Sequence, residues 1–338
     1  MRQLEAFTLG KKFDHPEMNE DSLVVMPNLG YAVIDGVTDR NGTRYGGMLS
    51  GQYASRTVKR AIEIFLLAQG QNDRPDLQFQ GGQHFIDYLG AAIHDGYVAH
   101  GALAAVAADW KLRGGCTVMA AMLLGDRLEV VAVGDSGIRV NGTDTLQVLK
   151  PLDDVTAILR RETWHYFEAL GRPVEDCDRH AASMTWQGTR NQPAGSVTAA
   201  AEVIAAIEQR AMQACRQHLP DVPEQELNLL IQHGISHGQG HFQNVTEPVL
   251  GYGGIDGFAV PARFVETRSY RLAEVETIEL FSDGYFKQGA GFGVADWETA
   301  FREVEAEDPH KIGRYMSTKG TTAAQLTDDR SYLGIRLK

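Results

Sequence analysis

The segments that read as β-strands lie near the two ends of this 338-residue chain, and the connections between them are short. Apolar runs at Leu23–Met26 and Tyr31–Ile34 are separated by Pro27-Asn28-Leu29-Gly30, which is typical of a hairpin. Further along, three runs are separated by two tight turns. Connections this short cannot cross over to make parallel pairs, so these three runs are predicted to form an antiparallel meander. They are Cys116–Leu124, Arg127–Gly134 and Ile138–Asn141.

Helical periodicity dominates the rest of the chain. Small and apolar residues repeat at helical spacing from Gly46 to about Gln69 and from about His84 to Val106. The stretch at about 152–270 differs from both ends and holds three helical patterns, Thr156–Leu170, Val197–Gln217 and Glu224–Ile231.

The C-terminal part returns to β-structure. Strands are predicted at Thr277–Phe281 and Ser331–Leu337, with helices at Trp297–Glu305 and Pro309–Ser317. Strands at both ends with helices between them indicate an α+β sheet sandwich closed by its own C-terminus. We therefore expect one domain over 1–338 with a largely helical insertion at about 152–270.

Composition excludes several classes of function. A formal charge of -12 disfavours binding to nucleic acid or to anionic membranes, because both surfaces would repel the chain. Cys116, Cys177 and Cys215 are widely separated and form no CxxC pair, which argues against a disulfide framework or a cysteine zinc site. No apolar stretch reaches signal-peptide or membrane-span length. A cytoplasmic protein is expected.

Acidic residues stand beside several of the predicted strands. Asp35-Gly36 follows Tyr31–Ile34, Asp283-Gly284 follows Thr277–Phe281, and Asp328 precedes the last strand. A carboxylate at the end of a buried strand is held rigidly and still reaches solvent, and several such oxygens together suit Mg²⁺ or Mn²⁺. One Asp-Gly alone is usually only a turn. Asp256-Gly257, in a glycine-rich segment, is interpreted in that way.

Taken in order, six short motifs resemble those of the protein phosphatase 2C family, which are metal-dependent serine/threonine phosphatases. The match covers roughly 1–150 and 271–338, whereas the central lobe matches no motif of the family. The motifs are Asn19-Glu20-Asp21, Val33-Ile34-Asp35-Gly36, Gly114-Gly115-Cys116-Thr117, Val131–Ser136, Leu280–Gly284 and Asp328-Asp329-Arg330-Ser331.

The resemblance implies a four-layer α-β-β-α sandwich of two antiparallel sheets flanked by helices, with a pair of metal ions at one edge of the sheets. By position, Asp35 would bridge the two ions and the Gly36 carbonyl would bind one of them. Asp283 and Asp328 would complete the shell of the other ion. The remaining candidates are Glu20 and Asp21, as ligands or as holders of metal-bound water, and Asp135, as a supporting residue or a third-metal ligand.

The implied activity is hydrolysis of phosphoserine and phosphothreonine monoesters in a phosphoprotein substrate. Two or more Mn²⁺ or Mg²⁺ ions would activate a water and neutralise the phosphoryl oxygens, with Asp35 and Asp283 acting through the metal-bound water. No cysteine or serine nucleophile is required for this chemistry.

The chain departs from the family at two positions. Pro16 stands where many relatives place an Arg that grips the substrate phosphate, so the phosphate-binding residue stays unknown. His15, Lys11 or Lys12 could replace it, although a solvated surface charge is the expected role of either lysine. Val37-Thr38-Asp39 replaces the His-Gly-Gly of eukaryotic members. Arg330 is expected to pair with a neighbouring carboxylate.

Two alternatives stay open, a histidine zinc site and a function without catalysis. His233, His237 and His241 have the four-residue spacing of helical zinc ligands, but Gly234, Gly238 and Gly240 favour a flexible loop. The second is a phosphatase-like binding or regulatory module without catalysis, which the missing Arg favours and the retained carboxylates oppose. The role of the lobe and the oligomeric state do not follow from the sequence.

Overall fold

The computed structural model describes residues 1–39, 41–71 and 74–338, which form two compact units. The first unit consists of 1–149, 253–303 and 328–338, and the second consists of 150–252 and 304–327. The predicted strands all belong to the first unit, as does Glu266–Arg271 from the end of the predicted lobe.

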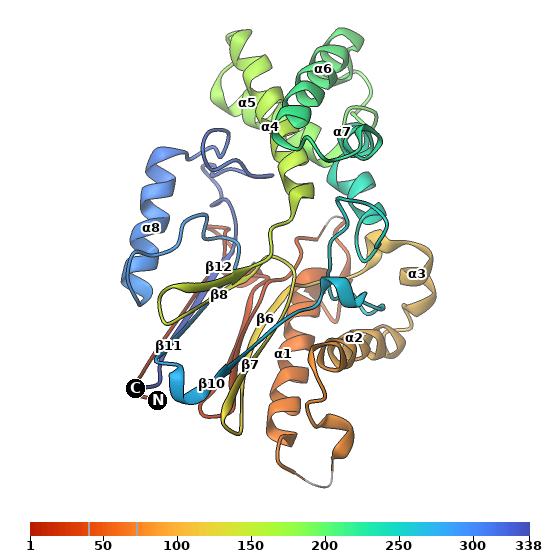
Figure 1. Cartoon of the computed structure of the whole chain (residues 1–338). Coiled ribbons are helices and arrows are strands. Elements are labelled where there is room, and N and C mark those ends of the chain that lie inside the picture. The colour runs from red at the N-terminus through yellow and green to blue at the C-terminus, as the bar shows by residue number, and fades with distance from the viewer. Residues whose placement is uncertain (40, 72–73) are drawn as a thin grey trace. The chain divides into compact units, whose positions relative to one another are not determined.

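One antiparallel sheet of the first unit joins the two ends of the chain. Its strand order is β1-β12-β11-β8-β9, so the N-terminal strand pairs with the C-terminal one (Figure 1). The register sets Leu9 opposite Arg330 and Phe281 opposite Tyr332. The strands are β1 (Gln3–Leu9), β8 (Gly137–Val140), β9 (Asp144–Gln147), β11 (Thr277–Phe281) and β12 (Arg330–Arg336).

The other antiparallel sheet has the strand order β10-β7-β6-β3-β2. Its strands are β2 (Ser22–Met26), β3 (Gly30–Ile34), β6 (Val118–Leu124), β7 (Arg127–Val133) and β10 (Glu266–Arg271). A small additional ribbon pairs β4 (Arg44–Tyr45) with β5 (Met48–Leu49).

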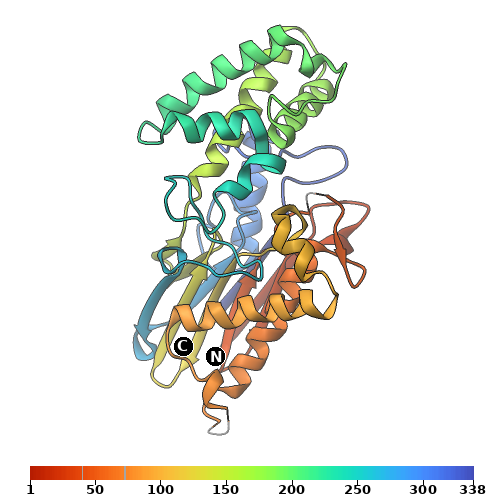
Figure 2. The ribbon, with the colours of Figure 1, turned by 90° about the vertical axis from the view of Figure 1, so that its right-hand side faces the viewer.

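Alternating side chains build two cores on the two faces of this second sheet. Along β3, Tyr31 and Val33 pack against residues of the first sheet, whereas Ala32 and Ile34 pack under helices α1 (Ser50–Ala68) and α2 (Gly82–Ala99). This is the period of two expected for a strand buried on both faces. The helices run across the outer face of the sheet (Figure 2). α3 (Leu103–Ala108) follows α2.

Helix α8 (Val294–Glu307) covers the first sheet, because Trp297 packs against Phe281 and Tyr332 in a separate buried cluster. A buried ion pair lies beside this cluster, since Arg139 donates to both oxygens of Glu279 at 2.7 and 2.8 Å. The predicted fold class is confirmed: two antiparallel sheets pack face to face and carry helices on their outer faces.

The predicted three-stranded meander is wrong in its last strand. β6 pairs with β7 as expected, but β8 pairs with β9 and β11 in the other sheet. The chain changes sheets at Gly134, whose φ of 89° lies in the left-handed region that glycine adopts without strain. The turn containing Asp135 therefore connects the two sheets instead of closing a hairpin.

The second unit is built mainly from four helices, α4 (Pro151–Ala169), α5 (Val174–Gln187), α6 (Ala201–His218) and α7 (Glu224–Gly238). They enclose their own core, which includes Trp164, Phe167 and Ile207.

The predicted helix at Pro309–Ser317 is wrong. The Asp308 carboxylate accepts hydrogen bonds from the main-chain N–H groups of Ile312, Gly313 and Tyr315, which offers this segment an alternative to helical hydrogen bonds. No helix in the described part of the chain is long and apolar enough to cross a membrane.

Candidate metal centre

Three aspartates from the turns after three different strands converge at one edge of the sandwich. Asp35 follows β3, Asp135 lies between β7 and β8, and Asp283 follows β11. One carboxylate oxygen from each lies within 4.8 Å of the other two. The antiparallel registers bring the ends of β3 and β7 in one sheet and of β11 in the other to the same edge. The side chains are partly exposed.

Hydrogen bonds fix the turns that carry these carboxylates. The Thr117 main-chain N–H donates to the Asp35 carbonyl at 2.8 Å, and the Thr117 hydroxyl lies 3.0 Å from that of Ser136. On the other side, the Ser331 N–H donates to the hydroxyl of Ser282 at 2.8 Å. Each turn is thus fixed by a hydrogen bond at the aspartate itself or at the residue beside it, so the group is preorganised.

Burial and electrostatic repulsion both disfavour the ionised forms of Asp35 and Asp283. Burial, followed by the charges of Asp21, Asp328 and Asp135, raises the pKa of Asp35 well above its ordinary value. Burial and the charges of Asp35 and Asp135 do the same to the pKa of Asp283. Carboxylates held this close disfavour one another's ionised form, and a cation placed among them would reverse that effect.

A fourth carboxylate, that of Asp21, requires a cation or a proton. It is buried, and neither of its oxygens has a hydrogen-bond partner among the described residues. Burial and the charge of Asp329 raise the pKa of Asp21 to about 7. An unsatisfied buried carboxylate costs free energy unless a cation or a proton is supplied. The donor set of carboxylate oxygens fits Mg²⁺ or Mn²⁺, because these ions prefer oxygen ligands.

Glycines allow the main chain to pack tightly around the centre. A Cβ atom at Gly36 would lie 2.5 Å from the Glu20 carbonyl oxygen and 2.7 Å from that of Gly51. A Cβ atom at Gly284 would lie 2.2 Å from the Asp329 carbonyl oxygen. The glycine after Asp35 and the one after Asp283 are therefore required by packing, independently of any ligand role for the Gly36 carbonyl.

The substitution Gly284→Ala is expected to destabilise the protein by about 2–4 kcal/mol, because the methyl group would force the Asp283 turn away from the Asp329 main chain. The control is Gly90→Ala in α2, where a Cβ would meet only the Phe258 carbonyl at 3.7 Å. That change should alter stability by at most about 1 kcal/mol, in the stabilising direction. Calorimetric melting of both variants measures the difference, and equal melting temperatures would contradict this account of Gly284.

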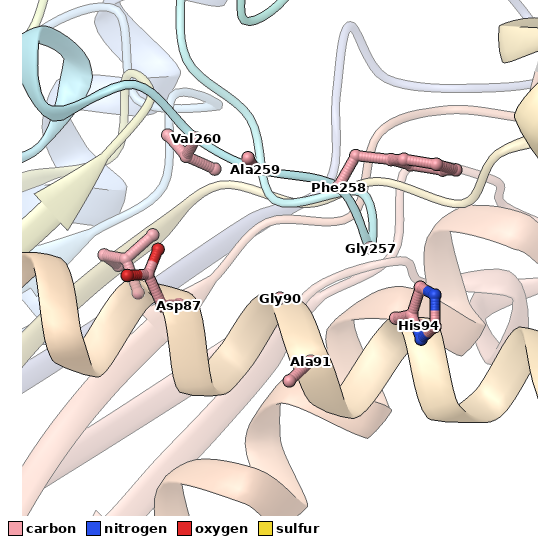
Figure 3. Close-up of a pocket in the computed structure, with 9 residues that line it drawn as sticks. Asp87, Gly90, Ala91, His94, Gly257, Phe258, Ala259 and Val260 are labelled. Carbon is pink, nitrogen blue, oxygen red and sulfur yellow. The ribbon is translucent and has the colours of Figure 1, made fainter.

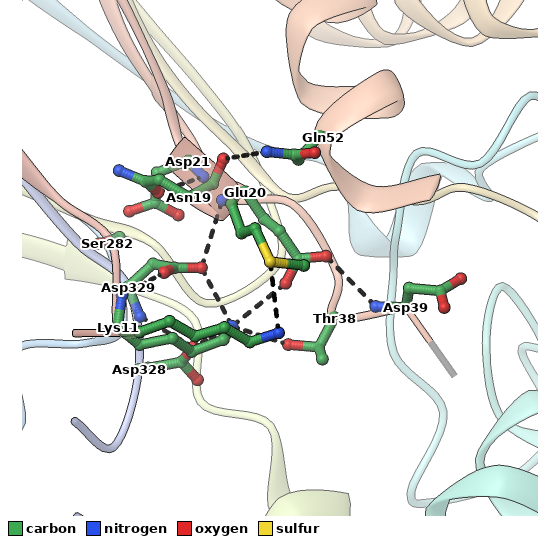
Figure 4. Close-up of polar contacts among 12 residues, drawn as sticks. Lys11, Asn19, Glu20, Asp21, Thr38, Asp39, Gln52, Ser282, Asp328 and Asp329 are labelled. Atoms are coloured by element: carbon green, nitrogen blue, oxygen red, sulfur yellow. Dashed lines mark hydrogen bonds and ion pairs between the residues drawn. The ribbon is translucent and has the colours of Figure 1, made fainter. Parts of the chain in front are cut away.

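Glu20 and Asp328, two further predicted ligands, surround a lysine instead of joining the three converging aspartates (Figure 4). The Lys11 ammonium donates to Glu20 Oε2 at 3.1 Å and to Asp328 Oδ1 at 3.0 Å. It also donates to Asp329 Oδ2 at 3.0 Å and to the Thr38 hydroxyl at 3.1 Å. The other oxygen of Glu20 accepts the main-chain N–H of Asp39.

The expected surface role of Lys11 is therefore wrong, because this residue is only 6% exposed. Lys12 is partly buried and its ammonium lies 3.7 Å from the sulfur of Met18, whereas His15 is exposed and pairs with Glu17. Arg330 pairs with a carboxylate, as predicted: its guanidinium donates to both oxygens of Glu298 at 2.9 and 2.8 Å.

Asp256 lies apart from the three converging aspartates and has a partner. The Arg113 guanidinium donates to its carboxylate at 3.1 Å and stacks on the Phe258 ring. Burial still raises the pKa of Asp256. The adjacent Gly257 lines a pocket against α2, formed with residues such as Asp87 and His94 (Figure 3). This pocket contains none of the converging aspartates.

The three histidines of the second unit lie on helical structure, so the predicted flexible loop is wrong. α7 continues to Gly238 and a 3-10 helix covers Gln239–His241. Gly234 bends α7 with a φ of 59°, and a Cβ there would clash with the main chain of α5 and the residues after it. Among the described residues, the three-ligand geometry is met by the three converging aspartates and not by these histidines.

No family model and no curated protein matches the sequence. Among solved structures, the chain is similar to the serine/threonine phosphatase Stp1 from Staphylococcus aureus, with 12% identity, a TM-score of 0.45, and coverage of 100% of this chain and 96% of that one.

Two structures of a second bacterial phosphatase also match. The Mycobacterium tuberculosis serine/threonine phosphatase PstP/Ppp has 18% identity and a TM-score of 0.39, with coverage of 99% of this chain and 98% of that chain. The catalytic domain of PstP in complex with two manganese ions has 16% identity and a TM-score of 0.40, with coverage of 98% and 96%.

Proposed function

We propose that this protein is a metal-dependent phosphatase of the protein phosphatase 2C type, which hydrolyses phosphoserine and phosphothreonine monoesters in a phosphoprotein substrate. The observation that carries the proposal is the convergence of Asp35, Asp135 and Asp283 from both sheets onto one point. The ordered motifs support the same function, because those that hold these three aspartates follow one another along the chain at separations of 100 residues (Asp35 to Asp135) and 148 residues (Asp135 to Asp283).

The residues of the centre would have different roles in this function. Asp35, Asp135 and Asp283 would hold a divalent cation, Mn²⁺ or Mg²⁺, and the Asp21 carboxylate would supply further negative charge beside them. Such a cation acts as a Lewis acid that lowers the pKa of water and neutralises charge on a phosphoryl group. The Thr117, Ser136, Ser282 and Ser331 hydrogen bonds keep the aspartate turns in position while the phosphate ester binds.

The test is hydrolysis of p-nitrophenyl phosphate and of a phosphothreonine peptide by the purified full chain. We expect release of phosphate from both substrates with Mn²⁺ or Mg²⁺, and loss of the activity when EDTA is added. Hydrolysis that continues unchanged in EDTA would contradict a metal-dependent mechanism.

A second candidate function is a phosphatase-like binding module, which the Lys11 contacts favour. Glu20 and Asp328 already have a cationic partner in Lys11, which reduces the number of carboxylates that require a metal. A protein that hydrolyses neither substrate with any divalent ion, yet binds a phosphopeptide, would establish this alternative.

A further inference from the structure

The pairing of the two ends of the chain places Lys11 beside Asp328 and Asp329. β1 and β12 are antiparallel, with Leu9 opposite Arg330. The residues that follow β1 therefore lie beside those that precede β12. The main-chain N–H of Lys11 donates to Asp329 Oδ1 at 2.7 Å, so the backbone as well as the side chain is fixed there.

The contacts of the ammonium are those of a bound cation. Three carboxylates, from Glu20, Asp328 and Asp329, have an oxygen 3.0–3.1 Å from Nζ. Their charges raise the pKa of Lys11 well above its ordinary value, although burial, the largest single influence, acts in the opposite direction. The ammonium has three N–H donors and faces four acceptors, including the Thr38 hydroxyl, so the carboxylates and this hydroxyl account for all of its donors.

This arrangement excludes a divalent ion from the same position. Mg²⁺ requires oxygen ligands at about 2.0–2.1 Å, whereas Nζ itself stands among the oxygens of Glu20 and Asp328. A second cation there would also be repelled by the ammonium at very short range. Glu20 and Asp328 are two of the ligands that the family resemblance assigns to the metal pair, so one part of that ligand set already has a cationic partner.

We propose that the Lys11 ammonium is a built-in cation that replaces one of the divalent ions, so that this chain binds metal only at the Asp35–Asp135–Asp283 group. This inference rests on the proposed metal-dependent function. It predicts that the chain binds fewer metal ions than a dinuclear centre would. It also predicts that substitution of Lys11 makes a second metal site available. It also gives Glu20 and Asp328 a role as partners of Lys11.

The test is the stoichiometry of Mn²⁺ binding to the full chain, measured by calorimetric titration for wild type, Lys11→Met and Lys12→Met. Methionine matches the lysine side chain as far as the ε-carbon and lacks the charged ammonium group. We expect Lys11→Met to bind about one more ion per chain than wild type, since Glu20, Asp328 and Asp329 lose their only positive partner among these contacts. Lys12→Met, whose lysine makes none of these contacts, should match wild type.

Equal stoichiometry in wild type and Lys11→Met would overturn the inference. Should Lys11→Met unfold in EDTA, the same inference requires Mn²⁺ to restore its folding, and a failure of Mn²⁺ to do so also overturns it. Failure of the proposed function has a different signature: wild type would then bind no Mn²⁺, or would bind it equally well after Asp283→Asn.

Discussion

The substitution Asp283→Asn is expected to lower kcat/KM for Mn²⁺-dependent hydrolysis of p-nitrophenyl phosphate by at least about 100-fold. Loss of a residue that merely orients a metal ligand typically costs 10–100-fold, and a direct ligand should cost more. Asn keeps the shape of the side chain but removes its charge. Asp283 lies in the turn after β11 and is one of only three described residues that meet the three-ligand geometry.

The matched control for this experiment is Asp126→Asn. Asp126 is an exposed aspartate in the β6–β7 turn of the same unit, so its substitution makes the same chemical change away from the centre. We expect its kcat/KM to stay within about twofold of wild type. An Asp283→Asn variant that retains activity close to that of the control would remove Asp283 from the mechanism.

The second large effect concerns stability in the absence of metal. Asp35→Asn is expected to raise the free energy of unfolding of the EDTA-treated protein by about 1–3 kcal/mol at pH 8.5, an upward shift in melting temperature of about 2–4 °C per kcal/mol. The reason is that burial, followed by the charges of Asp21, Asp328 and Asp135, disfavours the ionised form of Asp35 in the folded protein, whereas Asn carries no charge. Removing one charge relieves the repulsion.

The sign of the pH dependence follows from the raised pKa of Asp35. The folded state binds the Asp35 proton more tightly than the unfolded chain does, so this residue lowers stability as the pH rises from the ordinary aspartate range through the folded pKa. The stabilisation by Asp35→Asn should therefore shrink as the pH falls towards the ordinary aspartate range, where ionisation of the unfolded chain no longer favours unfolding.

With Mn²⁺ added at pH 8.5, wild type should have a higher melting temperature than Asp35→Asn, because only wild type keeps the Asp35 carboxylate that binds the ion. Calorimetric melting with EDTA and with Mn²⁺ measures both effects. If Asp35→Asn lowered the melting temperature in EDTA, the carboxylates would not be mutually repelling.

The sequence predicts well those parts of the molecule that depend on local pattern. Asp35 and Asp283 could be singled out because each follows an apolar run that forms a strand, β3 and β11. Asp135 was expected as a supporting residue or third-metal ligand, yet it lies among the three converging aspartates. The difference arises because its turn connects the two sheets, and a local pattern of strand, turn and strand does not distinguish that connection from a hairpin.

Long-range pairing accounts for what the sequence did not predict. Lys11 was expected at the surface because nothing in its neighbourhood indicates that β1 pairs with β12, which lies more than 300 residues away. That pairing brings Lys11 to Asp328. The alternation of polar and apolar residues in Gln3–Leu9 indicates a strand before Lys11, but it does not indicate the partner of that strand. The histidine segment of α7 shows a related effect, because Gly234 leaves the helical conformation where it packs against the main chain at the end of α5, and the helix continues on both sides of that bend.

The most direct test of the metal centre is anomalous diffraction from crystals of the wild-type chain grown with Mn²⁺. We predict a manganese peak within bonding distance of oxygens from Asp35, Asp135 and Asp283, and no peak at the position of the Lys11 ammonium. A manganese peak only at other positions, or no manganese peak at all, would contradict a metal centre at these three aspartates.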